Sequence, residues 1–187
     1  TILAFDTSGP RCAVAVLRGD VVLAAASEDM AKGQAERLMP LVTETLAAAG
    51  VGLADLDAIA VGTGPGNFTG IRLSVSAARG LALSLRKPAI GVSVLEAFAH
   101  GGPRPMIAQV DARRGAVYAQ VFAVDGAGDP AMITDPATLD ADLPRIGDNA
   151  AAPALPLAEA IARVARTRLD TTARPAPLYI RPVAAAP

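Results

Sequence analysis

The chain has 187 residues, of which 52% are hydrophobic and 19% charged, and its formal net charge is −1. This length and composition predict one compact domain or two small ones with ample core material. A charge balance so near zero excludes a strongly basic protein that coats nucleic acid. The single cysteine, Cys12, excludes a disulfide framework within the chain. No apolar run approaches the roughly 18 residues of a membrane span and no signal-like segment opens the chain, so we expect a soluble cytoplasmic protein.

The first hundred residues alternate between strand-like and helix-like patterns. Two apolar runs around Arg18-Gly19-Asp20 predict a hairpin over 12–27. Other short apolar runs, bounded by turn formers, predict buried strands at 2–8, 56–64 and 88–93. Apolar residues at helical spacing predict helices at 34–50, 68–86 and 94–100. The order β-β-β-α-β-α-β-α predicts an α/β, ribonuclease-H-like mixed sheet with helices.

The pattern changes after a cluster of proline and glycine at 101–105. Beyond it we expect a strand, turn and strand over 105–126, a polar loop-rich stretch over 126–144 and a last helix within 152–169. The sequence therefore predicts an N-terminal lobe over 1–102 and a smaller, reduced C-terminal lobe over 103–187.

The segment VGTGPGNFTGIRLS, residues 61–74, carries four glycines before a helical pattern. A phosphate-binding P-loop needs a lysine directly after its last glycine, and none follows Gly66. A dinucleotide-binding fingerprint fails by one residue of spacing and lacks its acidic partner. We interpret the glycines as a tight strand-to-helix turn, with Asn67 or Thr69 capping the helix. A direct ligand role is the alternative.

Four segments resemble, in order, signatures of the bacterial TsaB family, also called YeaZ, over almost the whole chain. They are ILAFDTS, GTGPGNFTGIRLSVSAARGLAL, VDARRGAVYAQVF and PLYIRPV. The resemblance implies an actin-like and Hsp70-like fold of two ribonuclease-H-like lobes. It also implies a non-catalytic subunit that activates a TsaD-type enzyme, which forms N6-threonylcarbamoyladenosine at position 37 of tRNAs reading codons that begin with A. A TsaE-type ATPase is a further expected partner, tRNA an indirect one, and no membrane is involved.

A reduced nucleotide site is expected where the two lobes meet. In actin-like ATPases, acidic residues after the first strand of each lobe approach phosphate and magnesium, and Asp6, Thr7 and Asp111 match those places. Two carboxylates could hold a hydrated Mg²⁺. The alternative for Asp6 is that it caps its own loop. The stretch 145–154 offers only Gly147 where nucleotide-binding relatives have glycine-rich turns. We therefore expect no cofactor on this chain, with ATP and a metal ion belonging to the partner subunits; an actin-like ATPase or small-molecule kinase is the alternative.

The sequence lacks the sets of residues that a metal site or a nucleophilic catalytic site needs. Cys12 and the only histidine, His100, are too few for a zinc site, and Cys12 fits a small core residue. No serine stands in a G-x-S-x-G setting. We therefore expect no catalytic residue and no metal site in this chain.

The helices expected at 34–50 and 68–86 are apolar around much of their circumference, which predicts a patch left over for a partner. The resemblance implies a helix bundle with a TsaD-type subunit, or with a second copy of this chain. The alternative is that the two helices simply cover each other. The residues expected at the interface are Ala35, Met39, Val42, Leu46, Arg72, Val75, Arg79 and Leu83.

The segment APLYIRPV, residues 176–183, carries apolar anchors in a tail otherwise rich in alanine and proline. We expect this segment to be ordered, with Leu178 or Ile180 packed on a helix and Arg181 near the junction of the lobes.

Overall fold

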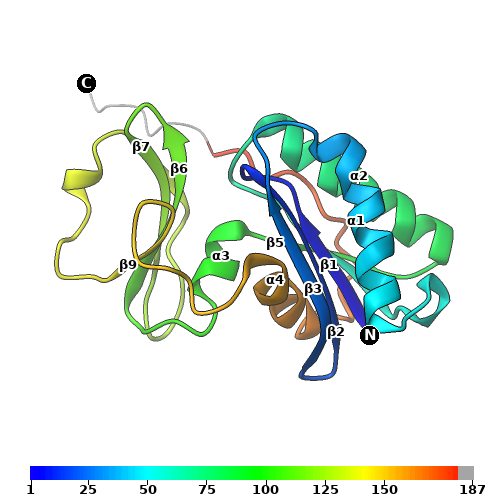
Figure 1. The fold of residues 1–187 in the computed structure, drawn as a ribbon. Helices are drawn as coiled ribbons and strands as arrows, with labels where there is room; N and C mark the ends of the chain where they lie inside the picture. The colour runs from blue at the N-terminus through cyan, green and yellow to red at the C-terminus, as the bar shows by residue number, and fades with distance from the viewer. Residues whose placement is uncertain (181–187) are drawn as a thin grey trace.

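The structure is a computed structural model, and it describes residues 1–180. Two β-sheets lie side by side, with helices between them and on the outer face of the first sheet (Figure 1). The first sheet has the strand order β3-β2-β1-β4-β5. Its strands are β1 Ile2–Asp6, β2 Arg11–Arg18, β3 Val21–Asp29, β4 Ala58–Gly62 and β5 Ala89–Val92. The predicted strands and hairpin of the first lobe are thus confirmed.

The first sheet is mixed, because β2 runs antiparallel to β1 and β3, whereas β4 and β5 run parallel to β1. All five residues of β1 and of β4 are buried. Strands covered on both faces read as continuous apolar runs, which is why these two were recognisable in the sequence. Alternate residues of β1 point to opposite faces, so Leu3 and Phe5 belong to one core cluster, and Ile2 and Ala4 to another.

Helices α1, Gln34–Ala49, and α2, Phe68–Leu85, cover the outer face of the first sheet (Figure 1). They bury Leu38, Leu41 and Ile71 against Leu3 and Phe5. The other face is covered by α4, Leu157–Arg166, and α3, Val94–Ala99, packs against α4 and the second sheet. A short 3-10 helix, Leu53–Asp55, precedes β4.

The second sheet has the order β8-β7-β6-β9. Its long strands are the predicted pair, β6 Met106–Arg113 and β7 Ala116–Phe122. The short strands β8, Ala131–Ile133, and β9, Arg145–Gly147, were not predicted from sequence, since three residues give no periodic signal. A second 3-10 helix, Pro136–Thr138, lies in the connection between them.

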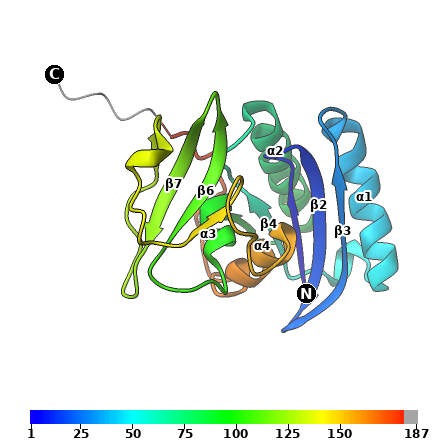
Figure 2. The same cartoon turned by 60° about the vertical axis from the view of Figure 1, so that its left-hand side comes forward.

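Helix α4 crosses the predicted boundary between the lobes at residue 102. It comes from the second half of the sequence, yet it packs on β1 and β2 of the first sheet (Figure 2). Ile161 is fully buried in the same cluster as Ile2 of β1 and Met106 of β6. One apolar core therefore joins both lobes through this helix.

The segment after α4 also returns to the first lobe. The Leu178 amide donates to the Thr63 carbonyl oxygen at 2.8 Å, and Ile180 packs against the shared core. Order in this segment is confirmed as far as residue 180, and Arg181 lies outside the described residues. No helix within residues 1–180 has the length and apolar character needed to cross a membrane.

Candidate functional site

The glycine-rich segment brings the start of α2 into direct contact with the turn after β1. A Cβ atom on Gly70 would lie 1.9 Å from the Thr7 carbonyl oxygen, so only glycine fits there. The Thr7 hydroxyl donates to the Gly70 carbonyl oxygen at 2.7 Å. The Asn67 side chain accepts from the Gly70 amide at 2.9 Å, which confirms Asn67 as the helix cap. These contacts support the structural interpretation of the glycines.

Asp6 stands at the end of β1 with no solvent exposure. Its Oδ1 accepts from the Ser8 amide at 2.9 Å and from the Ser8 hydroxyl at 2.8 Å, so Asp6 caps its own loop. Its Oδ2 has no hydrogen-bond partner within the described chain and faces Gly62, where a Cβ would lie 2.0 Å away. Burial raises the pKa of this carboxyl, and the two bonds from Ser8 oppose that shift.

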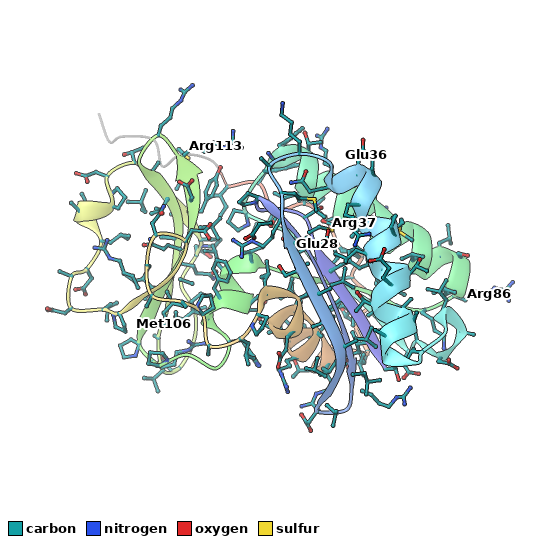
Figure 3. The ribbon with its side chains drawn as sticks, in the orientation of Figure 1. Glu28, Glu36, Arg37, Arg86, Met106 and Arg113 are labelled. Atoms are coloured by element: carbon teal, nitrogen blue, oxygen red, sulfur yellow. The ribbon has the colours of Figure 1, made fainter. Side chains whose placement is uncertain are left out.

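Asp111 occupies a different environment at the end of β6. Its carboxylate is exposed, and Oδ1 accepts from the Arg113 amide at 2.9 Å, which shapes the turn into β7. Arg113 lies at the tip of this hairpin (Figure 3).

These residues do not fit a hydrated magnesium ion. Such an ion needs carboxylate oxygens that reach water, whereas Asp6 and Thr7 are fully enclosed. Within residues 1–180, no group of three or more histidine, cysteine or acidic residues is arranged to hold a metal. Asp6, Thr7 and Asp111 can shape their loops, but they form no solvent-accessible site for a metal ion with a bound phosphate.

A polar junction between the lobes was missed by sequence reasoning. Asp148, in the loop after β9, lies 3.5 Å from the Arg11 guanidinium of β2 and accepts from the Asp111 amide at 3.1 Å. Its carbonyl oxygen accepts from the Gln109 side chain at 2.7 Å. Gly147-Asp148-Asn149 is a turn signal in the sequence. No local pattern, however, identifies Arg11 as a partner so distant along the chain.

Cys12 and His100 lie apart and serve the fold. Cys12 is fully buried, and burial, with a smaller contribution from Glu28, raises the pKa of its thiol to about 11. This confirms the interpretation of Cys12 as a core residue. His100 is half-buried at the end of α3, where burial and the nearby Arg163 lower its pKa.

Three of the residues expected at the interface belong to the core instead. Val42, Leu46 and Val75 are almost completely buried, and they pack in the cluster between the helices and the first sheet. The sheet-facing stripe of α1 is wider than expected, because it extends on one flank from Leu38 to Val42 and Leu46. These three residues cannot line an outer surface.

The other expected residues are exposed on α1 and α2. They are Ala35, Met39, Arg72, Arg79 and Leu83. Met39 is 40% exposed and Leu83 is 81% exposed. Arg72 has a structural task, since its Nε donates to the Tyr179 hydroxyl at 2.8 Å and its guanidinium lies over the Phe68 ring. It therefore ties α2 to the last described segment.

Charges on α1 gather on the flank toward β3. Arg37 pairs with Glu28 of β3 and with Glu44, and Figure 3 shows the Glu28–Arg37 pair between the helix and the sheet edge. Met39 follows two residues later and therefore lies on the opposite flank, toward α2.

An uncharged strip runs along the outer face of the two helices, beside the exposed charged residues Glu36, Arg72 and Arg79. On α1, exposed Met39, Thr43 and Ala47 recur at a spacing of four. On α2, after its first turn, the exposed uncharged residues are Ser76, Gly80, Leu83 and Ser84. We call these seven residues the outer helix face. Most side chains of the outer helix face are small, and they are apolar or weakly polar. Such patches favour protein contacts.

The mixed strand order, with helices on both faces of the first sheet and a second, smaller sheet, defines a two-sheet α/β protein. A family profile described as TsaD, tRNA N6-adenosine threonylcarbamoyltransferase, matches residues 26–140. The tRNA threonylcarbamoyladenosine biosynthesis protein TsaB of Escherichia coli strain K12 is 41% identical over 122 residues, covering 63% of this chain and 52% of that protein. The chain thus spans about half the length of the curated relatives it matches.

Two solved structures match nearly end to end. YeaZ from Pseudomonas aeruginosa is 30% identical with a TM-score of 0.76, covering 96% of this chain and 99% of that one. A Pseudomonas aeruginosa protein described as similar to peptidase YeaZ is 29% identical with a TM-score of 0.80, covering 97% and 99%. The chain belongs to the TsaB (YeaZ) family.

Proposed function

We propose that this chain is a non-catalytic subunit that docks on a TsaD-type enzyme through the outer helix face. In that role it would support the formation of N6-threonylcarbamoyladenosine at position 37 of tRNA. The relatives are named for this biosynthesis. The distribution of charge on α1 and α2 supplies the proposed docking surface.

The observation that carries the proposal is Gly80. A glycine in the middle of an exposed helix costs about 1 kcal/mol relative to alanine. Nothing within the described chain requires it, because a Cβ at this position would meet no atom within 4 Å. Its absence lets another helix approach closely, since the distance between packed helices depends on the side chains at their contact. Leu83 and Met39, both exposed, would supply the apolar contacts on either side.

A TsaD-type catalytic subunit is the proposed occupant, and a second copy of this chain could use the same face in its absence. A TsaE-type ATPase and tRNA would join through the complex. We propose that ATP and the metal ion belong to the partner subunits, which the enclosed state of Asp6 supports. The alternative of an actin-like ATPase would require Asp6 to reach a bound ion.

The test introduces one charge on each flank of α1 and measures partner binding by calorimetry. Met39→Asp should weaken binding to a purified TsaD-type protein at least about 100-fold, because an unpaired buried charge costs several kcal/mol. The matched control is Ala48→Asp, an exposed position on the flank that carries Arg37. It should change binding only a few-fold. Both variants should melt close to the parent temperature.

Tight binding by Met39→Asp would show that the outer helix face is not the docking surface. If Met39→Asp fails to fold, Gly80→Glu serves instead, because its side chain starts in open space. Steady ATP hydrolysis by the pure chain, abolished by Asp6→Ala, would favour the enzyme alternative.

A further inference from the structure

A groove of about 510 Å³ runs between the C-terminal half of α2 and residues 171–175. Four cationic side chains line it: Arg79, Arg86, Lys87 and Arg174. No carboxylate lines it, although the whole chain carries a net charge of −1. None of the four makes an ion pair within residues 1–180. The groove is therefore a concentrated positive region on a nearly neutral protein.

Arg86 has an unfavourable backbone conformation. It ends α2 in the left-handed conformation, with φ of 54°. Helix α1 ends in the same conformation, with φ of 64°, on Gly50. Glycine is the usual residue at this position, because a Cβ atom makes the left-handed conformation unfavourable. Figure 3 shows the Arg86 side chain extending from the end of α2 into solvent. The fold itself does not require an arginine at this helix end.

The spacing of the charges suits an extended anion. Arg79 and Arg86 lie seven residues apart on α2, which places them two turns and about 10 Å apart on one flank of the helix. Arg174 lies on the opposite wall of the groove. Charges distributed along and across a groove match a chain of phosphates better than a single anion.

The rest of the lining favours contact with a backbone over contact with bases. Ala82, Pro88 and Pro175 contribute to the floor, and the lining contains no aromatic, amide or acidic side chain. Aromatic and amide side chains, which supply much base stacking and base-edge recognition, are missing from it, whereas arginine, lysine and threonine bind phosphates. Gly80 and Leu83 line the groove and also belong to the outer helix face. A ligand in the groove would therefore share these two residues with a partner docked on that face.

We propose that this groove binds the phosphate backbone of RNA without reading its sequence. The inference rests on the proposed role in tRNA modification, which makes a tRNA the expected ligand. It also assigns to this chain a direct contact with tRNA, where the family resemblance implied only an indirect one.

The test is fluorescence anisotropy of the full chain with a labelled tRNA transcript in about 50 mM salt. Binding should weaken with salt at a logarithmic slope of about −3 if about three phosphates are contacted. Arg79→Gln/Arg174→Gln should weaken binding at least about tenfold and reduce the slope by about 2. The control Lys32→Gln/Arg114→Gln removes the same charge from exposed positions that do not line the groove and should leave binding unchanged.

Arg86→Gly separates a structural role from a binding role. It should raise the melting temperature, because glycine suits the left-handed helix end, and yet weaken tRNA binding several-fold. Failure of the parent chain to bind tRNA, or equal losses in the control pair, would overturn the proposal. Unchanged tRNA binding by Arg86→Gly, with weakened binding of a TsaD-type protein, would assign the groove to that protein and also overturn it.

Failure of the proposed function would look different. In that case the parent chain would bind tRNA through the groove and ignore the TsaD-type protein, and the inference about the groove would stand.

Discussion

The two faces of the first sheet are covered by helices of similar composition that differ in what lies beyond them. Helix α4 is enclosed between the first sheet and the second, and seven of its residues are buried, including Ala160, Ile161 and Ala162. Helices α1 and α2 bury one stripe each, and within residues 1–180 nothing covers the opposite stripe.

The exposed positions on the two faces differ in chemistry. On α4 they carry charges that pair with one another or with the β2–β3 hairpin: Arg163 pairs with Glu159, and Arg166 with Asp20. The seven residues of the outer helix face are uncharged, and the exposed Arg72 and Arg79 beside them make no ion pair within residues 1–180. Exposed apolar patches favour protein contacts, so the difference teaches that the outer helix face is suited to contact another protein.

The largest expected effect is a loss of stability, and it separates the enclosed helix α4 (the closed face) from the outer side of α1 and α2 (the open face). Ile161→Ala should lower the free energy of unfolding by about 2–5 kcal/mol, because it leaves a cavity in the core shared by both lobes. Met39→Ala, on the open face, should cost less than about 1 kcal/mol. Urea denaturation of both variants measures the difference. A similar loss in the two would mean that the open face is as tightly packed as the closed one.

Stability changes of intermediate size are expected when two glycines of α2 are replaced by alanine. Gly70→Ala should destabilise the chain by about 3 kcal/mol, since the new methyl group would meet the Thr7 carbonyl. Gly80→Ala should instead stabilise it by about 1 kcal/mol through helix propensity. Thermal melts of the two variants give opposite shifts if the structure is right. Destabilisation by Gly80→Ala would reveal a neighbour in solution that the outer helix face already contacts.

The smallest expected effect concerns pH and compares the enclosed Asp6 with the exposed Asp20. Burial raises the folded pKa of Asp6 above its ordinary value of 3.8, so the folded state keeps the proton longer than the unfolded one. Stability is therefore lost as pH rises from 3.8 through the folded pKa, and Asp6→Asn should remove this loss.

Asp20 should behave in the opposite sense, because its hydrogen bond from Arg166 lowers its pKa. Its contribution is present above pH 3.8 and disappears as pH falls through the folded pKa, and Asp20→Asn should abolish it. Urea denaturation at several values between pH 3 and 7 checks both signs. Parallel pH profiles for the parent and Asp6→Asn would contradict the burial assigned to this carboxyl.

The sequence by itself determined the elements of the first lobe, because their signals are local. Continuous apolar runs identified β1 and β4, a turn triplet identified the β2–β3 hairpin, and Asn67 was foreseen as a cap of α2. It also indicated the roles of Cys12 and Asp6, since one buried small residue and one loop cap need no distant partner. The ordered motifs were specific enough to indicate the family.

Only the tertiary structure decided which helix faces remain open. The periodicity of α1 could not show that Val42 and Leu46 belong to the core while Met39 does not, because the width of a buried stripe depends on the sheet beneath it. The return of α4 to the first sheet and the Arg11–Asp148 junction join residues far apart in the chain. The positive groove likewise forms only where α2 meets residues 171–175. Such pairings depend on chain topology, and a local sequence pattern carries no record of them.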